Sequence, residues 1–275
     1  MSRIVDFHIH CNSSDPEQVK QLAETCEKYE VAAALVGGLR YGATDYVPNE
    51  QVIQICREYP DLFYPLAKID LWEAPPNPDE ASRLAETGVR GFKFIYPYYA
   101  YDDDRYMPIY ERIETLGLPV LFHTGDFCPS PVDAVWRRPV LRNMDPVTLD
   151  RIARSFPKLN IVMAHLGTSL WRVPAAELVK THPNLYTDLA GHGSFAALSA
   201  EDLAGLLGPR RHVYGVERAF FHKLVFGSDA YVDKPSTLVS ALDHYRHLLD
   251  RLGLPAGLSA EIMGGTVGRW LGIPL

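Results

Sequence analysis

The sequence predicts a single α/β domain, residues 1–275, folded as a (β/α)8 TIM barrel. Eight apolar segments of strand length recur along the chain, and segments with helical spacing of apolar residues separate them. Most strand segments are continuously apolar, as expected for parallel strands covered on both faces. An open doubly wound sheet would show the same alternation. However, no GxGxxG motif follows the first strand, which removes the commonest open-sheet form.

The expected strands are spaced as in consecutive βα units. They cover residues 3–10, 31–37, 63–70, 89–96, 119–125, 160–167, 185–191 and 223–230. The Pro-rich stretches 74–78 and 129–139 follow the third and fifth strands, and we interpret them as loops within the domain.

Apolar residues three and four positions apart predict helices between the strands. The clearest stripes are Val19, Leu22, Ala23 and Cys26; Leu149, Ile152, Ala153 and Phe156; and Leu238, Leu242, Tyr245, Leu249 and Leu252. The second stripe follows Asp145-Pro146, an N-cap residue before a proline at the first helical position. The tail from Ser259 to Leu275 predicts an extra C-terminal helix on the outside of the barrel.

Charge and composition exclude some classes of partner. The net charge is −7, and no basic run of the kind found on nucleic-acid-binding surfaces is present. No segment has the length needed to span a bilayer, and the first residues form no apolar leader. The four cysteines lack CxxC spacing, which predicts reduced thiols. We therefore expect a cytoplasmic protein without nucleic-acid or membrane partners. A homo-oligomer is compatible with the sequence, which does not determine the oligomeric state.

Histidine and aspartate residues stand at the carboxyl ends of four predicted strands. His8 and His10 share one face of the first strand, because side chains alternate with a period of two. His123, His165 and Asp229 end the fifth, sixth and eighth strands, and these ends converge on one face of a barrel. A lone strand histidine is most often a hydrogen-bonded core residue. Five such groups together, all of types that zinc accepts, instead predict a metal site.

These residues lie in the phrases DFHIH, FHTG, AHLG and FGSDA. In this order the phrases resemble the amidohydrolase superfamily, and within it the amidohydrolase-related family. That family includes aminocarboxymuconate-semialdehyde decarboxylase, other aromatic-acid decarboxylases, lactone hydrolases and hydratases. The C-terminal EIMGGTVGRWLGI is also similar to the closing helix of the family, although Thr266 stands where an Asn is usual.

The resemblance implies one divalent ion, best a Zn2+ with Mn2+ as the alternative, held by His8, His10, His123 and Asp229. It implies that His165 and Asp229 handle protons near a metal-bound water. Lys93, on the fourth strand, stands where binuclear amidohydrolases carry a carboxylated lysine that bridges two ions. We favour a role for Lys93 in binding a substrate carboxylate over the bridging role, with a structural ion pair as the remaining alternative.

The loops after the strands should contact the substrate. The residues expected to do so, in addition to Lys93, are Tyr98, Arg137, Trp171 and Arg172, and His192 is a further candidate. Arginine and aromatic side chains suit a small anionic substrate. The expected activity is hydrolysis of a C–O or C–N bond in a small carboxylated lactone or cyclic amide. The alternative is non-oxidative decarboxylation of an aromatic or muconate-type acid. A non-catalytic protein with a structural metal is disfavoured, because structural zinc sites are closed and commonly use cysteine.

Overall fold

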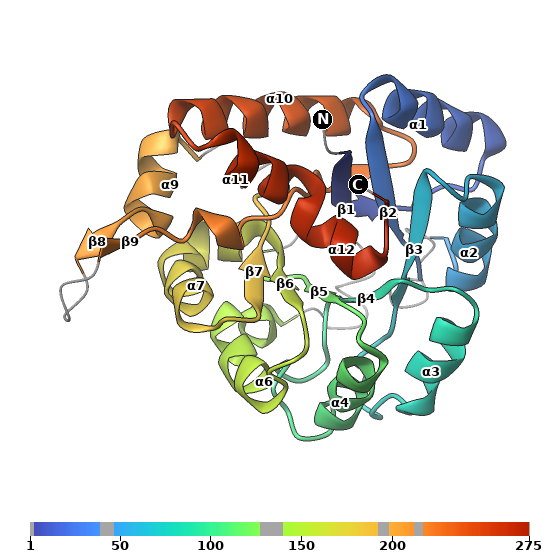
Figure 1. Cartoon of the computed structure of the whole chain (residues 1–275). Helices are drawn as coiled ribbons and strands as arrows, with labels where there is room; N and C mark the ends of the chain where they lie inside the picture. Colours follow the sequence, from blue (N-terminus) through green and yellow to red (C-terminus); the bar gives the residue numbers. More distant parts are fainter. Residues whose placement is uncertain (1–2, 39–46, 127–139, 192–197, 212–216, 275) are drawn as a thin grey trace.

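The computed structural model describes residues 3–38, 47–126, 140–191, 198–211 and 217–274, and it confirms the predicted barrel. The strands form a central ring with helices packed around it (Figure 1). The strands of the ring are β1 (Ile4–His10), β2 (Val31–Val36), β3 (Phe63–Lys68), β4 (Gly91–Phe94), β5 (Val120–Phe122), β6 (Ile161–Met163), β7 (Leu185–Thr187) and β10 (Ala230–Tyr231). The longer helices are α1 (Pro16–Lys28), α2 (Asn49–Glu58), α3 (Asp79–Glu86), α4 (Met107–Leu116), α6 (Leu149–Ser155), α7 (Thr168–Thr181), α9 (Ala200–Leu207) and α10 (Ser236–Arg251).

Each predicted helical stripe is buried on its helix. All four residues of the first stripe are buried on α1, and Asp15 caps this helix by accepting from two backbone N–H groups. Asp145 caps a short 3-10 turn, Pro146–Thr148, that leads directly into α6. Four residues of the third stripe are buried on α10, and the fifth, Leu252, is half-buried at the C-cap. Among the described residues, no helix is long and apolar enough to cross a membrane.

The barrel closes between β7 and β1 through residues 224–231. The backbone N–H of Val225 donates to the Thr187 carbonyl at 2.9 Å, and that of Phe7 donates to the Phe226 carbonyl at 3.1 Å. Only the last two residues of this stretch form a regular ladder with β1, as strand β10. The eighth predicted strand is therefore present but mostly irregular. A small hairpin, β8 (Arg210–Arg211) with β9 (Glu217–Arg218), projects from the barrel (Figure 1).

Side chains of the strands divide into an inner and an outer apolar layer. Val5, Ala32, Leu121 and Val162 belong to a cluster inside the barrel. Their strand neighbours pack in the larger cluster that includes the buried faces of the helices. Both layers explain why the strand segments are continuously apolar in sequence.

The C-terminal tail differs from the predicted single outer helix. It forms three short pieces, α11 (Ala256–Ala260), the π-helical turn η5 (Glu261–Gly265) and α12 (Thr266–Leu271). Val267 and Leu271 belong to the cluster inside the barrel, and η5 packs against β1. The tail thus covers the amino-terminal end of the barrel, where buried apolar side chains would otherwise contact water.

Gly264 allows this close approach and provides a test of it. A Cβ at this position would lie 2.5 Å from the Arg3 carbonyl oxygen and 2.7 Å from the Val5 nitrogen. We expect Gly264→Ala to push the tail away from β1 and lower the free energy of unfolding by about 1–3 kcal/mol. Gly257→Ala is the matched control, because nothing lies within 4 Å of its Cβ. Equal stability of the two variants in urea denaturation would contradict the role of the tail as a cover.

Candidate metal centre and active site

An irregularity in β1 fixes the positions of its two histidines. Asp6 pairs with Ala33 and Ile9 with Leu35, so β1 has one more residue than β2 between these pairs. Such a bulge redirects side chains locally. The Asp6 carboxylate stabilises it, because its Oδ1 accepts from the backbone N–H of His8 at 2.9 Å and of Ser228 at 3.0 Å.

His8, His10 and Asp229 form a tight triangle of ligand atoms. His8 Nε2 lies 3.2 Å from His10 Nε2 and 3.3 Å from Asp229 Oδ1, and His10 Nε2 lies 2.9 Å from Asp229 Oδ1. A tetrahedral zinc ion with ligands at about 2.0–2.1 Å holds neighbouring ligand atoms about 3.3 Å apart. The donor types and their spacing therefore fit one divalent cation, as the sequence predicts.

His123 and His165 form a second pair beside this triangle. His123 Nε2 donates to the Asp126 carbonyl at 2.8 Å, and His165 Nδ1 donates to the Ala190 carbonyl at 2.8 Å. In the neutral rings, the remaining nitrogens, His123 Nδ1 and His165 Nε2, then carry lone pairs, and they face each other at 3.2 Å. Two lone pairs cannot hydrogen-bond to each other, so this pair of nitrogens is suited to share a cation or a proton.

Burial favours the neutral form of three of these imidazoles, those of His8, His10 and His123. It lowers the pKa of His8 to about 3, with the adjacent Lys93 as the second cause, and lowers the pKa of His123 well below its usual value. Burial also lowers the pKa of His10. For Asp229 burial acts in the opposite direction, but the neighbouring His8 and His10 hold its pKa well below the usual range. Neutral imidazoles and a carboxylate are the forms that bind metal ions.

Lys93 lies inside the cluster. Its side chain is fully buried, and its Nζ is 2.9 Å from His8 Nε2. Burial lowers its pKa to about 8. Lys68 lies beside it in the register of β3 and β4, and its buried side chain forms an ion pair with the exposed carboxylate of Asp70. Sequence reasoning missed Lys68, although its place at the end of the third strand was a usable signal.

Asp188 is the second residue that sequence reasoning missed. It follows β7 and is fully buried, with Oδ2 2.9 Å from His8 Nδ1 and Oδ1 2.7 Å from the His165 nitrogen. The predicted strand 185–191 contains it, and its position at a strand end was the available signal.

Some of the residues predicted to contact the substrate lie in the described part of the chain. Trp171 and Arg172 are half-buried in the first turn of α7, directly after the turn that carries His165. Burial lowers the pKa of Arg172, and Asp202 and Asp126 are the acidic groups nearby that oppose this shift. Tyr98 is half-buried in the loop after β4. Arg137 and His192 lie outside the described residues.

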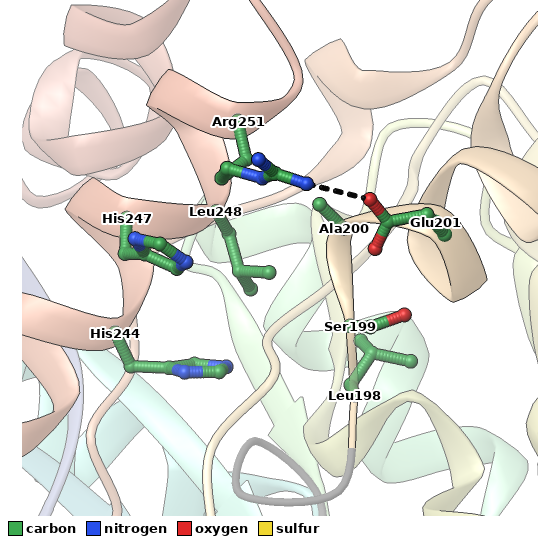
Figure 2. A pocket seen from close by; sticks show the side chains of 8 residues that line it. All are labelled: Leu198, Ser199, Ala200, Glu201, His244, His247, Leu248 and Arg251. Carbon is green, nitrogen blue, oxygen red and sulfur yellow. Dashed lines mark hydrogen bonds and ion pairs between the residues drawn. The ribbon is translucent and has the colours of Figure 1, made fainter.

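Two of the cavities in the described part of the chain lie outside the histidine cluster. One of about 380 Å³ is lined by Tyr98, Tyr99, Arg142 and Asn143, among others, in loops on the carboxyl side of the strands. The other, of about 400 Å³, lies between α9 and α10, where Arg251 and Glu201 form an ion pair (Figure 2). Of these two cavities, only the first is lined by a residue predicted to contact the substrate, Tyr98.

A family model described as amidohydrolase matches residues 5–273. A dihydroorotase of Allorhizobium ampelinum is 33% identical over 117 residues, which are 40% of this chain and 32% of that protein. This chain therefore matches about a third of the length of that relative.

Solved structures of similar fold cover the whole chain. The 5-carboxyvanillate decarboxylase of Sphingomonas paucimobilis has a TM-score of 0.62 at 17% identity, covering 100% of both chains. The 2,6-dihydroxybenzoate decarboxylase of Rhizobium has a TM-score of 0.60 at 17% identity, covering 99% of each chain. A candidate 2-pyrone-4,6-dicarboxylic acid hydrolase of Acinetobacter baumannii, solved with citric acid bound, has a TM-score of 0.63 at 14% identity, covering 98% of this chain and 99% of that one.

Tyr101 hydrogen-bonds to the backbone of His123, so its substitution tests how the histidine cluster is supported. It is fully buried, and its hydroxyl donates to the His123 carbonyl at 2.8 Å. We expect Tyr101→Phe to lower the free energy of unfolding by about 1–3 kcal/mol, because this buried carbonyl loses its donor. Tyr29→Phe, at the half-buried end of α1, is the control and should change stability little. Thermal unfolding that is unchanged in Tyr101→Phe would contradict this assignment.

Proposed function

Because this chain belongs to the amidohydrolase family, we propose that it is a metal-dependent hydrolase of a C–O or C–N bond in a small carboxylated substrate, of the lactone or cyclic-amide type. The observation that supports a metal-dependent reaction is the triangle of His8, His10 and Asp229 at the carboxyl end of the barrel. Active sites of (β/α)8 enzymes lie on this face.

These three residues would hold the ion, and His123 would complete the ligand set through Nδ1. That nitrogen is the one left unprotonated when His123 Nε2 donates to the Asp126 carbonyl. When bound, a zinc ion would supply an activated water molecule and polarise the oxygen of the scissile carbonyl.

Two residues are placed to move protons. Asp229 is the exposed corner of the triangle, with 20% of its side chain accessible while that of His8 is fully buried. A water molecule or substrate can therefore reach Asp229, and its carboxylate would take the proton of the attacking water. His165 keeps Nε2 as an acceptor because its Nδ1 donates to the Ala190 carbonyl. It would orient the water and pass a proton to the leaving group.

The charge around the cluster favours an anionic substrate. Lys93 lies beside His8, and the half-buried Arg172 follows the His165 turn. A substrate carboxylate near these cations would gain charge-assisted hydrogen bonds that strengthen where water is excluded. The likeness to a dihydroorotase over part of the chain supports a carboxylated cyclic amide such as dihydroorotate as one substrate to test.

Decarboxylation is the second candidate function. It is supported by the fold similarity to two decarboxylases over the full chain. The same residues would then bind the acid, and Asp229 or His165 would deliver a proton to carbon.

The first experiment is metal analysis beside a substrate panel. Purified protein should carry about one divalent ion per chain, and His10→Ala should lose the metal and the activity together because it removes one ligand. His247→Ala is the control, since this residue is exposed on α10.

The panel pairs carboxylated lactones and cyclic amides with aromatic acids. Release of carbon dioxide without hydrolysis would replace the hydrolase proposal with the decarboxylase. Full metal occupancy in His10→Ala would refute the site.

The second experiment separates the roles of Lys93. We expect Lys93→Met to keep its metal and to raise KM for carboxylated substrates. Loss of a charge-assisted contact should lower kcat/KM by about ten- to a hundredfold, or roughly 1.5–3 kcal/mol. A bridging carboxylated lysine would behave differently, because metal content would then fall from two equivalents to one, with partial restoration by short carboxylic acids.

A further inference from the structure

We propose that Asp188 is a positioning residue that sets the tautomer of His8 and the backbone conformation of His165 at the same time. The proposal rests on the proposed function only in taking His8 as a metal ligand. Asp188 follows β7, and its side chain is fully buried between the two histidines.

The first contact determines which nitrogen of His8 is available. Asp188 Oδ2 lies 2.9 Å from His8 Nδ1. A carboxylate can only accept, so Nδ1 carries the proton and Nε2 keeps its lone pair. Nε2 is the nitrogen that points to His10 and Asp229. Without this partner the ring can also adopt the tautomer protonated at Nε2, which leaves no lone pair for a metal at that nitrogen.

The second contact stabilises an unusual turn. His165 and Leu166 have φ values of 67° and 44°, in the left-handed region that non-glycine residues avoid. Asp188 Oδ1 accepts from the backbone N–H of His165 at 2.7 Å and of Ala190 at 3.1 Å. The Ala190 carbonyl in turn accepts from His165 Nδ1. A closed ring of hydrogen bonds through Asp188, Ala190 and His165 therefore fixes both the backbone and the imidazole of His165.

Each carboxylate oxygen has its own function, so Asp188→Asn separates the two. The amide oxygen can replace Oδ1, because that atom accepts from two N–H groups. The amide nitrogen then replaces Oδ2 and donates toward His8 Nδ1. The opposite orientation would place the amide nitrogen against two backbone donors. Asparagine thus keeps the His165 turn and favours the His8 tautomer protonated at Nε2.

The experiment measures tautomer and metal affinity separately. Long-range 1H–15N correlation spectra of the zinc-free protein, with His8 assigned through His8→Gln, should show His8 protonated at Nδ1 in the wild type and at Nε2 in Asp188→Asn. Titration with Zn2+ against a chromophoric chelator should show a ten- to a hundredfold loss of affinity in Asp188→Asn. Asp150→Asn is the matched control and should keep the wild-type affinity. Its Oδ1 lies 2.8 Å from Nε2 of another buried histidine, His182, which belongs to none of the site groups.

The outcomes are distinct. Wild-type His8 protonated at Nε2 would overturn the proposal even if Asp188→Asn failed to fold. An unchanged tautomer and unchanged zinc affinity in a folded Asp188→Asn would also overturn it. If the wild type binds no zinc but His8 shows the expected tautomer and its switch, the positioning role stands and the proposed metal-dependent function fails.

Discussion

The contact between the first and last strands of the barrel is the constraint on which the site depends. The N–H of Asp229 donates to the His8 carbonyl at 2.8 Å, so one hydrogen bond joins two members of the candidate ligand triangle from opposite ends of the chain. Asp6 reinforces this closure by accepting from both strands, across a separation of 222 residues to Ser228. The ligand triangle therefore forms only when the barrel has closed, and assembly of the site is coupled to folding.

Burying a polar cluster in an apolar barrel is costly unless each group is hydrogen-bonded. In this protein the outer ring nitrogens of His8, His123 and His165 are bonded to Asp188, to the Asp126 carbonyl and to the Ala190 carbonyl respectively. The inner nitrogens of His123 and His165 face each other, and that of His8 lies 2.9 Å from Lys93 Nζ. Burial lowers the pKa of His8 and His123, so their uncharged, ligand-competent form persists at neutral pH.

Backbone strain is concentrated at the same end of the barrel. In the described chain, the non-glycine residues with positive φ are Glu30, Tyr96, His165, Leu166, Thr168 and Asp229. Tyr96 follows β4, the residues His165, Leu166 and Thr168 follow β6, and Asp229 directly precedes β10, so all except Glu30 lie near the end of the barrel where the candidate ligands meet. Such conformations cost free energy and persist only where the surrounding contacts enforce them. The hydrogen bonds of Asp188 provide that enforcement for His165. The same carboxylate contacts His8, so it links the strained turn to a candidate metal ligand.

The sequence by itself determined the barrel, the eight strand positions and the convergence of His8, His10, His123, His165 and Asp229 on one end. Strand periodicity and the burial of parallel strands are local patterns, and the strand ends must meet once the sheet is closed. Only the tertiary structure decided how these residues are grouped. The β1 bulge, the contact of Lys93 with His8, the bonds of Asp188 and the C-terminal cover depend on contacts between residues distant in sequence, which no local pattern encodes. For the same reason the sequence could not separate the ligand triangle from the His123–His165 pair, because that division is set by hydrogen bonds to Asp126, Asp188 and Ala190.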